Sequence, residues 1–264
     1  MDRRGAAVEA VTGIGYYADL LRILIAKELK LRYRGTMLGI LWSLANPIAL
    51  ALVMGFAVTR VLKAGIPDYG LTILPALFAW HAISNSLYSS SLAFTGSASL
   101  IRKIRFPRYM ICVALVCSEL VHFAITIPIY GGVRAYYGHA PFEWVWLLGV
   151  PLLVLIQITL VLGGVMLIAT INAFLRDMQQ LVGVSMLLLF YMTPVLYPAE
   201  MVPEDLRWMI ALNPFATLVV SWRALLMDGV LSPYLGWAAA YALLFFAVGA
   251  GVYRRYQARL AEVI

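Results

Sequence analysis

The stretch from Trp144 to Phe174 reads WVWLLGVPLLVLIQITLVLGGVMLIATINAF and carries no Asp, Glu, Lys or Arg. A helix needs roughly 20 consecutive apolar residues to cross the hydrocarbon core of a bilayer, which is about 30 Å thick. The stretch therefore predicts a transmembrane helix that is long enough to cross at a tilt. Five further apolar stretches predict spans at Met37–Val61, Leu71–Phe94, Tyr109–Val133, Gln179–Val195 and Tyr234–Tyr253.

The composition is typical of a membrane protein. Hydrophobic residues make up 63% of the 264 residues and charged residues only 12%, whereas a soluble domain is about 25% charged. We therefore predict an all-α polytopic membrane protein with six transmembrane helices in residues 37–264, preceded by a cytoplasmic helix in residues 1–36. Such a chain belongs to a transporter, a membrane-embedded enzyme or a membrane scaffold.

The positive charges are unevenly distributed along the chain. The formal net charge is +7, and in a membrane protein basic loops set the orientation, so we expect no nucleic-acid partner. Most Lys and Arg residues fall on one side of the predicted spans, and Arg134 and Arg223 are among the few on the other side. We therefore predict a multi-pass protein with both termini in the cytoplasm. Cys112 and Cys117 both fall in the third span, which implies no disulfide.

Residues Tyr16–Arg34 predict an amphipathic helix at the cytoplasmic membrane surface. Its apolar face is interrupted by Glu28 and Arg32, which are spaced i,i+4 and could pair. The cations of this interface helix are Arg22, Lys27, Lys30, Arg32 and Arg34.

Two predicted cytoplasmic loops combine charged and apolar residues. The run from Leu100 to Arg108 reads LIRKIRFPR. It is either a loop that sets topology or a short amphipathic helix that docks into a partner's groove. The second loop contains Arg176 and Asp177 side by side, for which a helix cap or a local ion pair is the simplest explanation.

The segment before the last span is apolar but repeatedly interrupted by proline. Proline removes a backbone hydrogen bond, and a broken backbone is tolerated in a membrane where protein or a water-filled path satisfies it. We therefore predict two short re-entrant or interfacial helices, near Pro203–Leu212 and near Pro214–Met227, within a region of about residues 196–228.

Several enzyme classes lack their required residues. A phosphate-binding loop ends in Gly-Lys-Ser/Thr, but the four lysines are followed by Glu, Leu, Ala and Ile. The three histidines, His81, His122 and His139, do not have zinc-protease spacing. We predict no catalytic residue, no metal site and no cofactor bound by this chain.

Glu119 and His122 lie i,i+3 in the third span and share a helix face. An ionisable residue within the membrane is a functional candidate, so the pair could act as a proton relay. A structural hydrogen-bonded pair between packed helices is the other interpretation, and we favour it because no further chain of carboxylates accompanies the pair.

Aromatic residues occur where a pore could lie. Aromatic faces suit sugar rings, although helix packing uses the same side chains. The candidate channel-lining residues are Trp42, Tyr88, Phe190, Tyr191 and Tyr197.

Four stretches, in this order, resemble the transmembrane subunit of ABC exporters for polysaccharides such as O-antigen, teichoic acid or capsule. They are KLRYRGTMLGILWSLANP (30–47), LIRKIRFP (100–107), FLRD (174–177), and TPVLYP (193–198) with LNPF (212–215). The resemblance covers nearly the whole chain.

The resemblance implies a homodimeric channel in the inner membrane and two copies of a separate ATP-binding subunit, which would hold ATP and Mg. The cargo would be a lipid-linked polysaccharide, and Arg32 and Arg34 could meet its pyrophosphate. The first and fifth spans would line the path. The resemblance places ATPase coupling at Leu100, Ile101, Arg102, Lys103, Arg105, Phe106, Pro107, Arg176 and Asp177. It places a periplasmic gate at Pro194, Pro198, Trp208, Asn213 and Pro214.

Two other functions remain open at this point. An ABC permease for a drug or another small amphipathic substrate would share this architecture. A proton-coupled carrier would instead use Glu119 and His122 and would need no ATPase partner.

Overall fold

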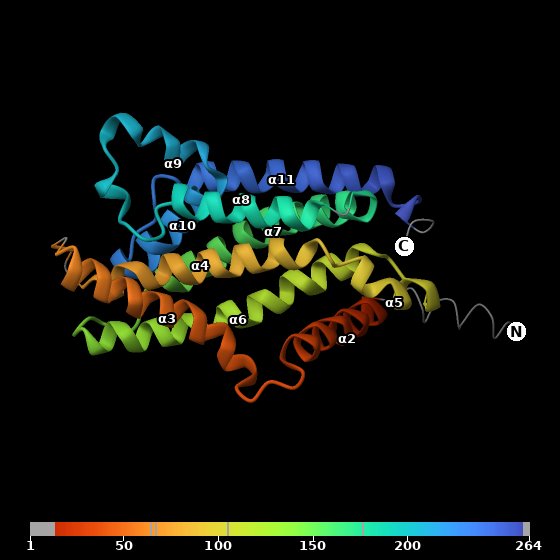
Figure 1. The fold of residues 1–264 in the computed structure, drawn as a ribbon, viewed down its shortest axis with the longest axis horizontal. Coiled ribbons are helices and arrows are strands. Elements are labelled where there is room, and N and C mark those ends of the chain that lie inside the picture. Colours follow the sequence, from red (N-terminus) through yellow and green to blue (C-terminus); the bar gives the residue numbers. More distant parts are fainter. Residues whose placement is uncertain (1–13, 64, 67, 105, 176, 261–264) are drawn as a thin grey trace, which may run out of the picture.

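The computed structural model describes residues 14–260 except 64, 67, 105 and 176, and every regular element in this part of the chain is helical. The predicted all-α class is therefore confirmed. The longer helices run roughly along one axis and form a bundle (Figure 1). The helices are α2 (Ile14–Tyr33), α3 (Trp42–Phe56), α4 (Tyr69–Ser90), α5 (Ala98–Lys103), α6 (Tyr109–Tyr136), α7 (Trp146–Phe174), α8 (Met178–Met192), α9 (Trp208–Leu212), α10 (Pro214–Arg223) and α11 (Leu235–Tyr256).

Within the described residues, four helices are long and apolar enough to cross a membrane. They are α6, α7, α11 and the helix Trp42–Val61, which joins α3 to a π-helical turn. The bent pair Glu204–Leu212 and Pro214–Asp228, at 106°, adds a fifth candidate if it forms one span. The six transmembrane helices predicted from the sequence are therefore not established by helix length and composition. The first span also begins later than predicted, because Gly39–Leu41 forms a separate 3-10 turn before Trp42.

Helix α4 accounts for much of the difference in span count. It has 22 residues, but His81, Ser84, Asn85 and Ser86 interrupt its apolar sequence. Most of its side chains are nevertheless buried, because α3, α6, α7 and α10 pack around it. A helix that is mostly covered by protein can carry polar residues that a lipid-facing helix could not. The other short candidate, α8, is apolar but has only 15 residues.

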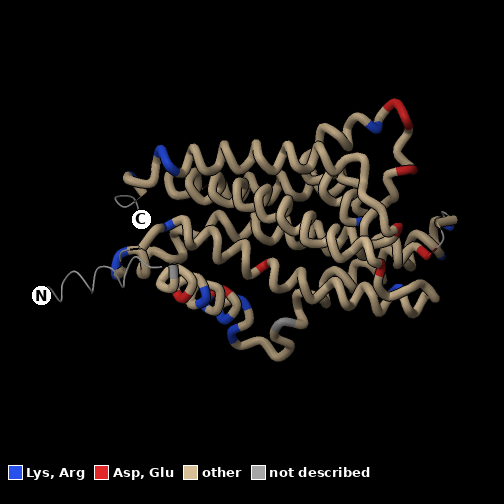
Figure 2. The backbone as a smooth tube through the Cα atoms, turned by 180° about the vertical axis from the view of Figure 1, so that it is seen from behind, with Lys and Arg blue, Asp and Glu red and all other residues tan. Residues whose placement is uncertain are grey.

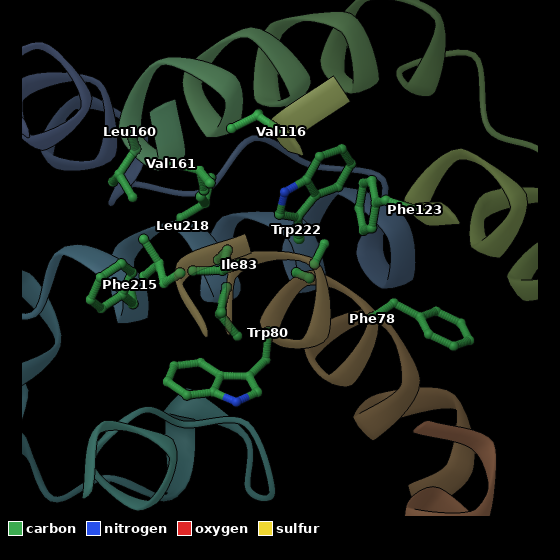
Figure 3. Packing of buried hydrophobic residues seen from close by; sticks show 14 of the residues in the cluster. Phe78, Trp80, Ile83, Val116, Phe123, Leu160, Val161, Phe215, Leu218 and Trp222 are labelled. Carbon is green, nitrogen blue, oxygen red and sulfur yellow. The ribbon is translucent and has the colours of Figure 1, made fainter. Parts of the chain in front are cut away.

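Trp222 of α10 lies at the centre of the buried core (Figure 3). Its ring packs edge-on against Phe123 of α6, with ring centroids 4.8 Å apart. Its indole Nε1 donates a hydrogen bond of 2.7 Å to Oε1 of Gln157 in α7. Within a bilayer, helices associate through close packing and interhelical hydrogen bonds. Trp222 supplies both, and it holds the broken segment (residues 193–228) against two long helices, α6 and α7.

Helices α7 and α11 make the most extensive helix–helix contact of the described chain. At Gly163 and Gly249 their backbones touch, and a Cβ atom on either residue would overlap main-chain atoms of the other helix. Small residues allow this close approach between membrane helices. The glycines therefore set the distance between the two helices.

We predict that Gly249→Ala lowers the free energy of unfolding by about 1–3 kcal/mol, the usual cost of overpacking. Gly251→Ala is the matched control, because a Cβ atom there meets nothing within 4 Å. Thermal unfolding of the detergent-purified variants measures the difference. Equal stability of the two variants would contradict the packing described here.

Candidate functional site

Most of the described Lys and Arg residues lie towards one end of the bundle, and a few lie at the other end (Figure 2). The start of α2, the short helix α5 and the C-terminal end of α11 all lie at this basic end (Figure 1). Acidic residues are concentrated towards the opposite end, around the loop before α9 (Figure 2). The structure thus brings the predicted interface helix and the predicted coupling loop to the same end of the protein.

The predicted coupling loop begins with a short helix, α5 (Ala98–Lys103), which agrees with the second of the two interpretations left open by the sequence. Leu100 and Ile101 are half-buried, whereas Arg102 and Lys103 are exposed. After α5, Phe106 and Pro107 are half-buried before α6 begins. Asp177 is exposed and immediately precedes α8, but its side chain makes no capping hydrogen bond. Arg105 and Arg176 lie outside the described residues, so the local pair expected between Arg176 and Asp177 stays a prediction.

Helix α2 is joined to the α5 region by polar and apolar contacts. Lys27 Nζ donates a hydrogen bond of 2.9 Å to Ser97 Oγ, in the turn just before α5. Leu24 of α2 is buried in a small cluster with Met110 and Ala114 of α6, and Leu100 and Phe106 pack against this cluster. These contacts connect α2 to the region around α5.

The cations of α2 do not all pair as the sequence predicted. The expected pair between Glu28 and Arg32 is not made, because Glu28 pairs with Lys27 at 3.0 Å and Arg32 pairs with Glu119 of α6. Glu119 is almost fully buried, and a buried carboxylate needs a countercharge far more than an exposed one does. The other basic residues remain on the exposed face: Arg22, which pairs with Asp19 at 3.4 Å, together with Lys30 and Arg34.

Arg32, Tyr33, Glu119 and His122 form a polar cluster between α2 and α6. A hydrogen bond of 2.8 Å joins the Tyr33 hydroxyl to His122 Nε2, and His122 Nδ1 lies 3.8 Å from Glu119. Burial disfavours the charge on Arg32, but the hydrogen bond and charge of Glu119 outweigh this and raise the pKa of Arg32 above its ordinary value. The pair predicted from the third span thus acquires two partners from the interface helix. The position of Arg32 on the apolar face of that helix was the available sequence signal.

The predicted channel aromatics lie in two groups. Trp42 of α3 and Tyr88 of α4 are exposed and border one hollow, and the Tyr88 hydroxyl donates to the Gly183 carbonyl at 3.2 Å. Phe190 and Tyr191 are neighbours on α8, with ring centroids 5.4 Å apart, and Phe190 also packs against Trp80. Tyr191 is exposed. Tyr197 is half-buried in the loop after α8.

The broken segment contains two short helices, α9 and α10, near the predicted positions. Asn213 begins α10, and its side-chain oxygen accepts hydrogen bonds from the backbone N–H groups of Phe215 and Ala216 at 3.0 and 3.2 Å. Its amide nitrogen donates to Thr193 Oγ1 at 3.0 Å. Pro214 occupies the first helical position, where its missing N–H is not needed. Of the other predicted gate residues, Pro194 is buried, Pro198 is half-buried and Trp208 is exposed.

Arg223 holds the irregular backbone of this segment together. It donates to the carbonyls of Thr72, Val195 and Tyr197 at 3.0, 2.8 and 2.9 Å. The count of loop charges placed Arg223 in a connection outside the spans, and the structure shows that it is buried within α10, with only 6% of the residue exposed. The fixed fork of guanidinium donors suits several carbonyls at once.

Arg134 was also assigned to an outside loop and is also buried. Its guanidinium pairs with Glu143 at 2.6 Å and donates to the carbonyls of Leu226 and Met227, both at 2.7 Å. It therefore links the end of α6 to the end of the broken segment. Among the described residues, no group of three His, Cys, Asp or Glu side chains is placed to hold a metal ion.

Comparison of the sequence with known proteins identifies the family of this chain. The model of the ABC-2 type transporter family matches residues 19–227, from the interface helix through the broken segment. The chain belongs to the ABC-2 type transporter family.

Individual members of the ABC-2 family match a larger part of this chain than the family model does. An O-antigen export system permease protein RfbA of Klebsiella pneumoniae is 36% identical over 253 residues, which cover 95% of this chain and 97% of the relative. The protein of the same name from Myxococcus xanthus is 32% identical over 245 residues, which cover 91% and 94% of the two chains. The family and its apolar helices make this chain a multi-pass membrane permease.

We predict that Arg223→Met destabilises the protein by about 2–4 kcal/mol, because three buried carbonyls lose their donor. Arg207→Met is the matched control, since Arg207 belongs to the same segment but is exposed. Thermal unfolding in detergent measures both variants. An Arg223→Met protein as stable as the control would show that water or lipid headgroups replace the guanidinium.

A second prediction concerns the pair of Arg32 and Glu119. In a double-mutant cycle with Arg32→Gln and Glu119→Gln, we expect a coupling free energy of at least about 1 kcal/mol, because a buried carboxylate loses its counterion. The exposed pair of Asp19 and Arg22 should give less than about 0.5 kcal/mol in the same assay. Additive effects at Arg32 and Glu119 would mean that the two helices are not coupled through this cluster.

Proposed function

We propose that this chain is the membrane subunit of an ATP-driven exporter that moves a lipid-linked, O-antigen-like polysaccharide from the cytoplasm to the periplasm. The observation that carries the proposal is the basic end of the bundle. There α5 contacts α2, and its cations Arg102 and Lys103 are exposed to a partner. The names of the relatives, which are O-antigen export permeases, point to the same cargo. Two copies of the chain would form the channel, and two ATP-binding subunits would supply ATP, Mg and the hydrolysis.

The orientation follows from the distribution of charge. With the basic end in the cytoplasm, the positive-inside rule is obeyed, and both termini are cytoplasmic in the inner membrane. We infer six crossings, made by α3, α4, α6, α7, α8 and α11. Helices α9 and α10 then form a re-entrant gate at the periplasmic side, held by Arg223 and Asn213.

The coupling mechanism begins at α5. Leu100, Ile101 and Phe106 present apolar surface and Arg102 and Lys103 present charge to a groove of the ATP-binding subunit. Closure of the two ATP-binding subunits pushes α5, and the Lys27–Ser97 hydrogen bond carries the movement to α2. The polar cluster of Arg32, Tyr33, Glu119 and His122 passes it on to α6 inside the membrane.

The path itself uses aromatic side chains. Trp42 on α3 and Tyr191 on α8 are exposed in the single chain, so they are available to line a channel between two copies. Stacking of sugar rings on such faces is weak and tolerant of sequence, which lets a polymer keep moving. The proton-carrier alternative is disfavoured because Glu119 is already engaged in an ion pair with Arg32.

We predict that Arg102→Glu/Lys103→Glu abolishes stimulation of the partner ATPase and strongly reduces polysaccharide at the cell surface, because the docking charges are reversed. Arg207→Glu, a charge reversal on the exposed segment at the other end of the molecule, should leave both unchanged. ATPase activity of the purified complex and surface labelling of the glycan measure the outcome. Normal coupling in the double variant would refute docking at α5.

A further inference from the structure

A hollow of about 380 Å³ opens where α2, α3 and α4 meet. The end of α2 and its following loop contribute Arg32 and Thr36, the start of α3 contributes Trp42, and the last turns of α4 contribute Asn85, Tyr88 and Ser89. The volume lies within the roughly 300–1,000 Å³ typical of small-molecule pockets. The hollow thus has the size of a ligand site and draws its walls from three separate elements.

The wall of the hollow is almost neutral. Arg32 is its only charged residue among the described residues, and its charge is balanced by Glu119 directly behind it. A diphosphate group requires cations that are not already paired. The hollow therefore does not suit the pyrophosphate that the sequence had led us to place against Arg32. The exposed cations Lys30 and Arg34, on the adjoining end of α2, are better suited to that group.

The remaining wall combines flat apolar faces with uncharged polar groups. Trp42 and Tyr88 provide the rings, and the hydrogen bond from Tyr88 to the Gly183 carbonyl holds the Tyr88 ring in place. Within the described part of the chain, the amide of Asn85 and the hydroxyl of Ser89 have no hydrogen-bonding partner in the protein. Such groups are free to bond to a ligand.

This combination fits one class of ligand better than its competitors. A sugar ring has an apolar C–H face that packs on an aromatic ring and hydroxyl groups that both donate and accept hydrogen bonds. An acyl or isoprenoid chain would leave Asn85 and Ser89 unsatisfied, at a cost in affinity. A separate hollow of about 540 Å³, lined by residues such as Ile127, Leu147 and Val150, is the more apolar of the two.

We propose that the hollow at Trp42 and Asn85 binds the first sugar residue of the lipid-linked glycan, next to the diphosphate and on the side of the molecule from which the cargo is loaded. This inference rests on the proposed export function and adds a recognition step to it. Trp42 and Tyr88 stack on the ring, and Asn85 and Ser89 bond to its hydroxyl groups. Lys30, in the last turn of α2, and Arg34, which follows α2, are exposed and available to the diphosphate.

The test uses the complete complex with its ATP-binding subunit in nanodiscs and two radiolabelled probes. One is a polyprenyl diphosphate that carries a single N-acetylhexosamine, and the other is the same lipid diphosphate without sugar. Binding of each is measured for wild type, Trp42→Leu, Asn85→Leu and Trp42→Phe, with Leu148→Ala as a control on the exposed face of α7.

We expect wild type to bind the sugar-bearing lipid about 10-fold more tightly than the bare lipid, as one or two hydrogen bonds and a stacked ring would give. Trp42→Leu and Asn85→Leu should lose this preference without weakening binding of the bare lipid, and Trp42→Phe should keep most of it. Leu148→Ala should match wild type.

The possible failures are distinguishable. Equal binding of the two probes by wild type, or unchanged preference in Trp42→Leu and Asn85→Leu, overturns the sugar site and leaves the export function standing. A wild-type complex that binds neither probe overturns both the sugar site and the proposed export function.

Discussion

The whole structure depends on one constraint: inside a bilayer, every backbone hydrogen-bonding group must find a partner within the protein. Long helices meet it by themselves, but the loop after α8 cannot. Its carbonyls at Val195 and Tyr197 are bonded by Arg223, and its carbonyl at Leu196 is bonded by the Tyr69 hydroxyl at 2.6 Å. A break in the helical bundle is thereby made compatible with the membrane, and a break is what a gate requires.

The same constraint explains how charge is used on the two sides of the molecule. Arg134 and Glu143 satisfy each other while Arg134 also bonds to the end of the broken segment. Arg32 and Glu119 neutralise each other while joining α2 to α6. Pairing offsets part of the cost of removing these charges from water. Each pair also adds a polar link between two elements that pack through other contacts as well. These connections give the proposed coupling path its continuity from α5 to the interior of the bundle.

Much of this architecture was predictable, and the reasons are local. The unbroken apolar run of α7 and the prolines around the break indicated a long apolar helix and an interrupted helical region, because both depend on neighbouring residues. The partner of Arg32 and the burial of Arg134 and Arg223 could not be predicted, because these residues bond to groups 87 or more positions away in several cases, such as Thr72 for Arg223. Charge counting assigns an Arg to one side of the membrane, but it does not indicate whether the side chain is buried, as Arg134 and Arg223 are. The polar residues of α4 are likewise tolerated because other helices cover it, and the sequence alone does not reveal which helices these are.

The proposed exporter is a membrane subunit that is driven by an ATP-binding partner, and the lipid-linked glycan stimulates the complex. The most direct test is to purify this chain with its ATP-binding subunit, reconstitute the complex in nanodiscs and measure ATP hydrolysis with and without a lipid-linked polysaccharide. The account predicts a stable complex of two copies of each subunit whose ATPase activity rises several-fold with the glycan. A stable complex whose activity is indifferent to the glycan would contradict the assigned cargo.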